Sequence, residues 1–312
     1  MEYLRTTLSS LEGFGSEQIA FVDKSVYADA KSNGVDLSYD RMLYYEEIDD
    51  MMRGEFVINL DMGILNCPQP LVPGVEVKFS FERAPATFAL FYKDEKATTK
   101  PKDLDGKVVN IAEAFLELEY VSSPYLRNLN STIIEKPITY YYDDCQIYYT
   151  NCAKGTTTLR VSSLCGGLTP EYLFAGFMRA KSLSPDFETT CGNFVNPGIR
   201  DVNITLNGAS VHGYPISSFL PNNVTQLYSR FIQTLGRFKK TVAGGTITQT
   251  TFKDDFCLIS HHFEGQMINE GYIGFDVKFD APAAEDYVFV VFTIRNNALT
   301  VDRFHKITKA LF

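Results

Sequence analysis

Short runs in which apolar and polar residues alternate with a period of two are spread along this chain. They are Glu55–Asp61, Val75–Phe81, Val202–Leu206 and Ile273–Phe279. In Val75–Phe81, every second residue is valine or phenylalanine, and Glu76, Lys78 and Ser80 stand between them. Because successive side chains of a strand point to opposite faces, such runs are typical of sheets with one buried and one solvated face. The pattern predicts a mainly β protein.

Apolar or aromatic runs bounded by turn residues predict further strands. These strands are Thr87–Tyr92, Val108–Val121, Ile138–Thr150, Thr157–Val161, Tyr172–Ala180, Ile199–Leu206, Thr246–Phe252, Phe256–His261, Tyr272–Phe279, Val288–Ile294 and Leu299–Arg303. Val288–Val291 contains no polar residue, so we expect that strand to be buried on both faces. Asn207 and Gly208 predict a two-residue hairpin turn, because both residues tolerate positive φ.

Few helices are predicted, and they are short. Met1–Leu11 and Thr225–Leu235 each carry apolar residues on one stripe. Asn223 is placed to cap the second helix at its start, and Gly236 is placed to stop it. Ser16–Arg53 is mixed and acidic, and it predicts a long excursion with short helical pieces.

Breaks in composition divide the chain into two parts. Lys93–Gly106 and Ser182–Gly198 are polar or rich in Ser, Pro and Gly, and they predict exposed loops. Ser122–Pro124 ends the strand before it, so we place a boundary there, with domains at 1–123 and 124–312. Many short strands in two parts predict two antiparallel β-sandwiches. The jelly roll, with eight strands in two facing sheets, is one form of such a sandwich.

The negative net charge of the chain argues against nucleic acid as its main binding partner. The 312 residues carry a net charge of −9, with a pI near 5.1, whereas gripping nucleic acid needs a basic face. The basic residues of Arg237–Lys240 and Arg303–Lys309 are interpreted as solvated surface. No apolar stretch approaches the roughly 20 residues that cross a bilayer, and Met1–Leu11 lacks a signal-peptide core. We expect neither sequence-specific nucleic-acid binding nor membrane insertion.

Cysteine usage indicates a reducing compartment, cytoplasm or nucleus. The six cysteines are Cys67, Cys145, Cys152, Cys165, Cys191 and Cys257. None is spaced as CxxC, and a chain of this length can bury a sufficient core without disulfides. We expect free thiols. Cys145 and Cys152 are interpreted as ordinary buried cysteines, because a nucleophilic role would need a base nearby.

The chain carries no catalytic signature. GxxxxGK[ST], GxGxxG, HExxH and GxSxG motifs are all missing from the sequence. His261 and His262 form the most metal-like feature, but neighbours on a strand point to opposite faces, which favours a structural role. We predict no catalytic, cofactor-binding or metal-ligating residues, no cofactor and no enzyme activity.

Two acidic groups are also interpreted structurally. The cluster Glu46–Asp50 lacks the spacing and central glycine of a calcium loop, and it predicts a solvated surface segment. Asp143 and Asp144 precede Cys145 within the tyrosine-rich run Tyr140–Tyr149. No second acidic pair or histidine is placed beside them for acid–base chemistry, so we interpret them as a turn or bulge between strands.

Several segments, taken in order, resemble one protein family. They are GEFVINLDMGILNCPQPLVPGVEVKFSF (Gly54–Phe81), VVNIAEAFLELEYV (Val108–Val121), YLFAGF (Tyr172–Phe177), VNITLNGASVHGYP (Val202–Pro215), LYSRFIQTLGRF (Leu227–Phe238) and GYIGFDVKFDAPAAEDYVFVVFTIRNNALTVDR (Gly271–Arg303). Together they resemble the double jelly-roll major capsid proteins, most closely those of Polinton/Maverick-type transposons and adintovirus relatives. The first segment resembles the end of the first jelly roll in that family.

The resemblance implies a structural protein without an active site. It implies a homotrimer that mimics a hexamer and contacts neighbouring capsomers and a minor capsid or penton protein. The trimers would tile an icosahedral, DNA-containing shell, so the location would be the virion capsid. Met1–Ala30 is similar to an internal helical segment of the family, so we expect the first jelly roll to be incomplete. The missing strands would come from a second chain or another copy by strand addition; the alternative is a degraded or differently spliced element copy.

Two other classes of function stay open at this stage. Jelly rolls also serve as binding modules without catalysis, and tyrosine-rich runs such as Tyr140–Tyr149 can stack on sugars or contact a protein ligand. An enzyme on a cupin-like jelly roll would need clustered His and Glu ligands, for which the chain has too few histidines. We rank the capsid subunit first, the binding module second and the enzyme third.

Overall fold

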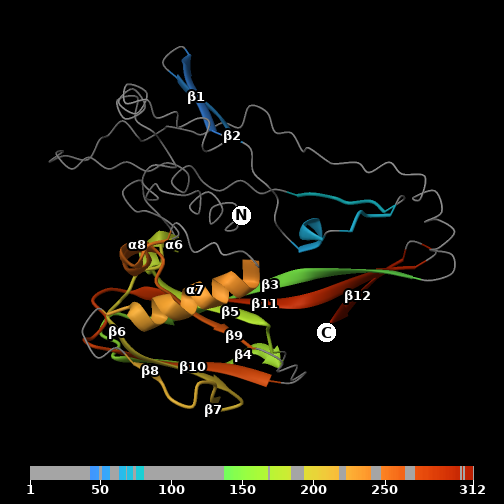
Figure 1. Cartoon of the computed structure of the whole chain (residues 1–312). Coiled ribbons are helices and arrows are strands. Elements are labelled where there is room, and N and C mark those ends of the chain that lie inside the picture. Colours follow the sequence, from blue (N-terminus) through green and yellow to red (C-terminus); the bar gives the residue numbers. More distant parts are fainter. Residues whose placement is uncertain are drawn as a thin grey trace. The chain divides into compact units, whose positions relative to one another are not determined.

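The computed structural model describes thirteen stretches of the chain (Figure 1). They are residues 43–48, 51–56, 63–67, 69–72, 75–80, 137–167, 169–183, 193–217, 223–239, 247–263, 271–302, 304 and 306–311. Two compact units are present, and the larger comprises Asp61–Phe79, Ala114–Ala180 and Asn193–Phe312.

Several predictions fall outside the described residues. They are the helix Met1–Leu11, the strands Thr87–Tyr92 and Val108–Val121, the loop Lys93–Gly106, and the domain boundary between residues 123 and 124.

The smaller unit contains a β-hairpin. Strand β1 (Leu43–Ile48) pairs antiparallel with β2 (Met51–Phe56), with Ile48 opposite Met51. The prediction of an irregular, partly helical excursion was wrong here, because the Leu, Tyr and Ile residues of β1 favour a pleated strand despite the acidic residues among them. The predicted strand Glu55–Asp61 overlaps β2 only up to Phe56, and its remainder lies outside the described residues.

The larger unit is built on two antiparallel sheets. The β11 sheet has the order β3-β11-β5-β9, and β12 pairs with the far end of β11. The β10 sheet has the order β4-β10-β6, and β7 and β8 both pair with β6. The bounds are β3 (Ile138–Cys152), β4 (Thr158–Gly167), β5 (Tyr172–Arg179), β6 (Ile199–Leu206), β7 (Ala209–Ser210), β8 (Ile216–Ser217), β9 (Leu258–His262), β10 (Gly271–Phe279), β11 (Tyr287–Val301) and β12 (Ile307–Leu311).

The path of the chain between these sheets is that of a jelly roll. It runs from β3 in one sheet to β4 in the other, returns to β5, and crosses again to β6, β7 and β8. It then crosses to β9, to β10 and finally to β11. If β7 and β8 count as one interrupted edge strand, two facing sheets of four strands result, which is the jelly-roll arrangement. The predicted mainly β, jelly-roll fold class is therefore confirmed.

The inner faces of the two sheets form the core. Val202 and Ile204 of β6 are fully buried, and they face a core that includes Phe275 of β10 and Phe289 and Val291 of β11. Alternate residues of each strand supply this core, as the period-two pattern predicts. Each such side chain contributes roughly 1.5–3 kcal/mol when it is removed from water.

The outer faces of the two sheets differ. On the β10 sheet, β6 alternates buried residues with partly exposed ones such as Asn203, so its outer face is polar. On the β11 sheet, Val288 and Val290 are buried outside the main core, together with Met178 and Phe194. The prediction that Val288–Val291 is buried on both faces is confirmed.

Gly176 allows the second apolar layer to approach the β11 sheet closely. A Cβ atom at this position would lie 2.6 Å from Phe194 Cδ1 and 2.9 Å from Leu258 Cδ2. Only a residue without a side chain fits there. Phe194 reaches this place because Val195 forms a bridge with Phe177 of β5.

Helix α7 (Thr225–Lys239) packs against β9 and β8, which are edge strands of the two sheets (Figure 1). The Val224 carbonyl accepts the first helical bond from Tyr228 N–H at 2.8 Å, and Asn223 Oδ1 accepts from Thr225 N–H at 3.0 Å. Val224 is therefore the N-cap, and the prediction of Asn223 at that position was wrong by one residue, although its side chain still binds the first turn. The predicted stop at Gly236 was wrong, because the helix continues for three more residues.

Three short helical pieces complete the described part. They are η2 (Gly63–Asn66), α6 (Ala180–Leu183) and α8 (Gln249–Asp255). Helix α8 replaces the predicted strand Thr246–Phe252. Thr248 Oγ1 accepts a hydrogen bond from Thr251 N–H at 3.2 Å, and Phe252 is fully buried. Such a cap and buried anchor outweigh the β preference of a threonine run.

One other strand prediction, Val75–Phe81, was wrong, and three others differ from the structure only in their bounds. Val75–Ser80 belongs to no strand, because no described segment pairs with it, and an alternating run needs a partner for its backbone groups. The predicted strands Val288–Ile294 and Leu299–Arg303 are one strand, β11. The Thr157–Val161 strand continues to Gly167, with register shifts against β10.

The predicted turn or bulge at Asp143 and Asp144 was also wrong. Both residues lie inside β3, which pairs with β11 over fifteen residues without a shift in register. The predicted hairpin turn is confirmed: Asn207 has a φ of 53° and Gly208 a φ of 82°, and they join β6 to β7.

Candidate functional surfaces

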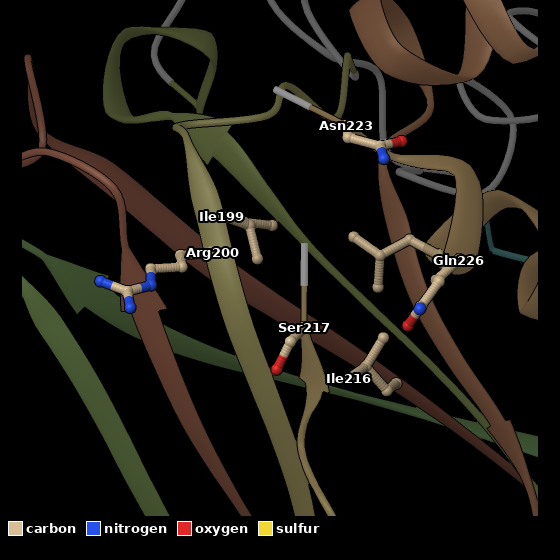
Figure 2. Close-up of a pocket in the computed structure, with 7 residues that line it drawn as sticks. Ile199, Arg200, Ile216, Ser217, Asn223 and Gln226 are labelled. Atoms are coloured by element: carbon tan, nitrogen blue, oxygen red, sulfur yellow. The ribbon is translucent and has the colours of Figure 1, made fainter. Parts of the chain in front are cut away.

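A small pocket lies where β6, β8 and the start of α7 meet (Figure 2). It is lined by Ile199, Arg200, Ile216, Ser217, Asn223, Gln226 and Leu227. Its volume of about 30 Å³ has room for one or two water molecules. Figure 2 shows the Arg200 side chain directed away from Ile216 and Gln226. The lining offers no nucleophile paired with a base, so the pocket is unsuited to catalysis.

The adjacent histidines lie on opposite sides of β9, as predicted. The ring of His261 meets His212 and Phe263 edge-on, with centroid distances of 4.7 and 4.5 Å. The ring of His262 stacks on Tyr172 at 4.6 Å. Within the described stretches, no group of three or more His, Cys, Asp or Glu residues is placed to hold a metal ion.

The carboxylate of Asp144 joins three strands of the β11 sheet. Its Oδ2 accepts hydrogen bonds from Lys309 Nζ of β12 at 3.1 Å and from Asn297 Nδ2 of β11 at 3.0 Å. The hydrogen bond to Asp144 raises the pKa of Lys309. Asp144 is therefore a structural link and not half of a catalytic pair.

A polar cluster interrupts the apolar interior at the middle of β11. Arg295 is only 4% exposed, and it donates to Gln146 Oε1, which also accepts from Tyr148 Oη at 2.8 Å. Thr293 is fully buried beside them and donates to the Gln146 carbonyl. These bonds hold β3 and β11 together from the core side. No sequence pattern indicates this cluster, because a buried arginine is recognised only once its partners are known.

The five described cysteines are free, as predicted, and Cys191 lies outside the described residues. Burial raises the pKa of Cys257 to about 12 and that of Cys165 to about 11. Partial burial raises the pKa of the Cys152 thiol too. Cys145 is exposed, contrary to expectation, because odd-numbered residues of β3 face outward. The protonated form of these thiols is unreactive.

Exposed apolar side chains line the outward face of β3. Tyr141, Ile147 and Tyr149 are 61%, 37% and 48% exposed. They stand opposite Ala298, Phe292 and Val290 of β11, so they continue the apolar outer layer of the β11 sheet to its edge strand. We name Tyr141, Ile147 and Tyr149 the β3 face. Asp143 and Cys145 lie between Tyr141 and Ile147 on this face, so its apolar part is interrupted, and only Ile147 and Tyr149 are adjacent.

Strands β3 and β11 extend beyond the end of β5 and carry a second small core there (Figure 1). Val72, Tyr140 and Val301 are buried together. Tyr140 Oη accepts from Val72 N–H at 3.0 Å and donates to the Pro70 carbonyl at 3.4 Å. This cluster attaches the segment before the jelly roll to the two longest strands.

Among the described residues, no helix is both long enough and apolar enough to cross a bilayer. Neither a protein-family model nor a curated protein matches the sequence.

Solved viral structures resemble the chain over just over half of its length. A chain of the Sputnik virophage, solved by cryo-electron microscopy, matches with a TM-score of 0.36 and 14% identity over 56% of this chain and 39% of that one. The mavirus major capsid protein matches with a TM-score of 0.35 and 14% identity over 56% and 42%. The PBCV-1 virus capsid matches with a TM-score of 0.35 and 10% identity over 57% and 52%.

The matched region therefore spans about half, or less, of the length of those viral chains. These identities and TM-scores are too low to establish the fold. The fold is therefore assigned from the strand order of this chain itself.

Proposed function

We propose that this chain is a structural subunit of a protein shell, a major capsid protein of the double jelly-roll class, and not an enzyme. The observation that carries the proposal is the arrangement of two sheets in jelly-roll order, one of which has an apolar outer face. This outer layer is covered within the chain around Val290, but it continues onto the exposed Ile147 and Tyr149 of β3, which another copy can cover. The ordered sequence segments that resemble the capsid family support the same function.

The finer features of the proposal come from the resemblance. The chain forms a homotrimer whose copies contact neighbouring capsomers and a minor capsid or penton protein, and the trimers tile an icosahedral DNA-containing shell of the Polinton/Maverick type. Residues 1–123 form the end of a first jelly roll and 124–312 form the second. A second chain or another copy supplies further strands of the first. Assembly takes place in a reducing compartment, cytoplasm or nucleus.

The binding module without catalysis is the alternative function, for a carbohydrate or a protein ligand. A carbohydrate-binding site needs a concave surface with aromatic side chains and convergent polar groups. The pocket of about 30 Å³ next to α7 has no aromatic lining. No observation on the described residues therefore favours this alternative over the capsid subunit.

Measurement of mass and shape in solution tests the proposal. We expect purified full-length protein to elute as a particle of three times the 35.1 kDa subunit mass in light scattering, and to show trimers or shells by electron microscopy. A monomer that stays monodisperse at high concentration would contradict a shell function. Binding of that monomer to a glycan array would support the binding module.

The β3 face provides a sharper test by substitution. Ile147→Glu places a charge on this face, and we expect it to reduce the trimeric fraction while the circular dichroism spectrum stays that of the wild type. Tyr272→Glu is the matched control, because Tyr272 is 55% exposed on the outer face of the other sheet. Equal association of both variants would show that the β3 face takes no part in assembly.

A further inference from the structure

Two arginines of α7 donate hydrogen bonds to histidines on different elements. Arg230 Nη1 lies 3.2 Å from both ring nitrogens of His212, in the turn after β7, and Arg237 Nη1 lies 2.9 Å from His262 Nδ1 on β9. A guanidinium group only donates and stays charged at any physiological pH. The imidazole nitrogen that it contacts must therefore accept, which only a neutral histidine can do.

The first of these contacts belongs to a cluster formed by three elements. His212 comes from the β7–β8 turn, Arg230 from α7 and His261 from β9, with the two imidazole rings 4.7 Å apart. Phe263 closes one side of the His261 ring. The cluster thus joins the helix to both of the sheet edges that it covers.

The titratable or charged side chains that act on this cluster are all basic. The groups that act electrostatically on His261 are His212 of the turn, Arg230 of α7 and His262 of β9, and Arg230 acts on His212. No carboxylate stands among them in the described part of the chain. Burial, followed by these neighbours, lowers the pKa of His261 to about 4, and burial followed by Arg230 lowers the pKa of His212.

His262 has a different environment on the opposite side of the same strand. Its Nε2 lies 3.8 Å from Glu171 Oε1, and Glu171 also accepts from Asn296 Nδ2. This side of β9 therefore carries a carboxylate, unlike the side on which His261 lies. His262 therefore serves as an internal control for His261.

We propose that His212, His261 and Arg230 form a proton-sensitive latch that holds α7 on the edges of the two sheets at neutral pH and releases it in acid. A proton on either histidine places a second positive charge beside Arg230. On His212 it also removes an acceptor from the guanidinium group. Release of the helix uncovers the edge strands β8 and β9. This inference is independent of the proposed capsid function.

The direction of the pH effect follows from linkage. A histidine whose pKa is lower in the folded state than its usual 6.5 stabilises the closed state fully above pH 6.5, and this contribution is lost as the pH falls toward the folded value. For His261 the loss therefore extends from pH 6.5 down to about 4. The opening constant is the equilibrium constant for release of α7. Relative to neutral pH, protonation of His261 alone raises it roughly tenfold at pH 5.5 and roughly 80-fold at pH 4.5.

Hydrogen exchange of the full chain, followed by mass spectrometry of peptides from 225–239 and corrected for intrinsic rates, tests the latch. In the wild type, we expect the opening constant of α7 to rise roughly tenfold between pH 7.5 and 5.5. In the double variant His212→Gln, His261→Phe it should change less than about twofold, because neither replacement titrates. The control His262→Gln should follow the wild type.

The same pH dependence in the double variant as in the wild type would overturn the proposal. If that variant does not fold, the titration of individual histidine ring protons in the wild type by NMR decides the question. We expect the pKa of His261 to lie well below 6.5, and Arg230→Met to raise the pKa of His212. A pKa for His261 at or above 6.5 would show that its protonation does not destabilise the closed state, which would overturn the proposal.

Discussion

The hydroxyl group of Tyr140 is the hydrogen-bond acceptor for a buried backbone N–H group. The ring is 1% exposed, and its oxygen accepts the backbone N–H of Val72, which is itself buried. The same hydroxyl donates to the Pro70 carbonyl. A buried N–H without an acceptor loses its hydrogen bonds to water without replacement. This one oxygen therefore secures the segment around Val72 on β3.

We expect Tyr140→Phe to lower the free energy of unfolding by about 1–3 kcal/mol, because the ring stays and the Val72 N–H loses its partner. Urea unfolding monitored by circular dichroism measures the change. Tyr272→Phe is the control, because this side chain is 55% exposed, and it should change stability by no more than about 0.5 kcal/mol. Equal effects of both substitutions would contradict the assigned role of Tyr140.

At the scale of residues, the sequence predicts whatever depends on near neighbours. The Asn207-Gly208 turn follows from local backbone rules, and so does the hydrogen bond by which Asn223, one residue before the N-cap, binds the first turn of α7. Arg295 contacts Gln146, which is 149 residues away in the sequence. Arg230 contacts His212, which is 18 residues away on a different element. No local sequence pattern indicates either contact. The cluster of His212, Arg230 and His261 could not be predicted for the same reason.

Helix α8 shows how an element changes type when a cap and a buried anchor agree. Its sequence is rich in threonine, which favours strands, yet Thr248 caps the helix and Phe252 fills the core against Phe231. The ring of Phe252 also contacts the ring of Tyr228 edge-on, with a centroid distance of 5.4 Å, so α8 packs against α7.

We expect Thr248→Ala to cost about 0.5–2 kcal/mol of stability, because the Thr251 N–H loses the oxygen that caps it. Thermal unfolding of the full chain, read as a change in Tm, measures this loss. Thr250→Ala is a matched control inside the same helix, where an exposed threonine gives way to a better helix former. A loss from Thr250→Ala as large as that from Thr248→Ala would contradict the capping assignment.

The strand errors have a common physical cause at this scale. Period-two alternation identifies a face but not a partner, so Val75–Ser80 has the pattern without the pairing. Conversely, polar residues at the middle of β11 interrupt the pattern, although fifteen paired residues of β3 keep the strand continuous. Pairing between distant segments is decided by tertiary structure and cannot be derived from either segment alone.

The sandwich of the larger unit is asymmetric. The outer face of the β10 sheet is polar, whereas that of the β11 sheet is apolar and buried around Val290. The number and spacing of the runs predicted antiparallel sandwiches, whereas the jelly-roll order of the strands was an expectation from the family resemblance. The asymmetry was predicted only for Val288–Val291, because only there is the apolar run uninterrupted.

We expect Val290→Lys to abolish soluble, folded protein, because Val290 is 1% exposed and an unpaired buried charge costs more than about 4 kcal/mol. Ser162→Lys, at an exposed position of β4 in the other sheet, should leave the yield and Tm nearly unchanged. Yield of soluble protein and near-UV circular dichroism measure both. Tolerance of Val290→Lys would show that the outer face of the β11 sheet is not covered by protein.

Strand β11 has a mechanical consequence, because it is bonded along its full length to β3 and, on its other side, to β5 and then β12. A pull along the strand axis loads fifteen rungs in parallel, and they must fail together. A force applied perpendicular to the strands breaks the paired residues one after another. The subunit should therefore resist tension much better along β11 than at right angles to it.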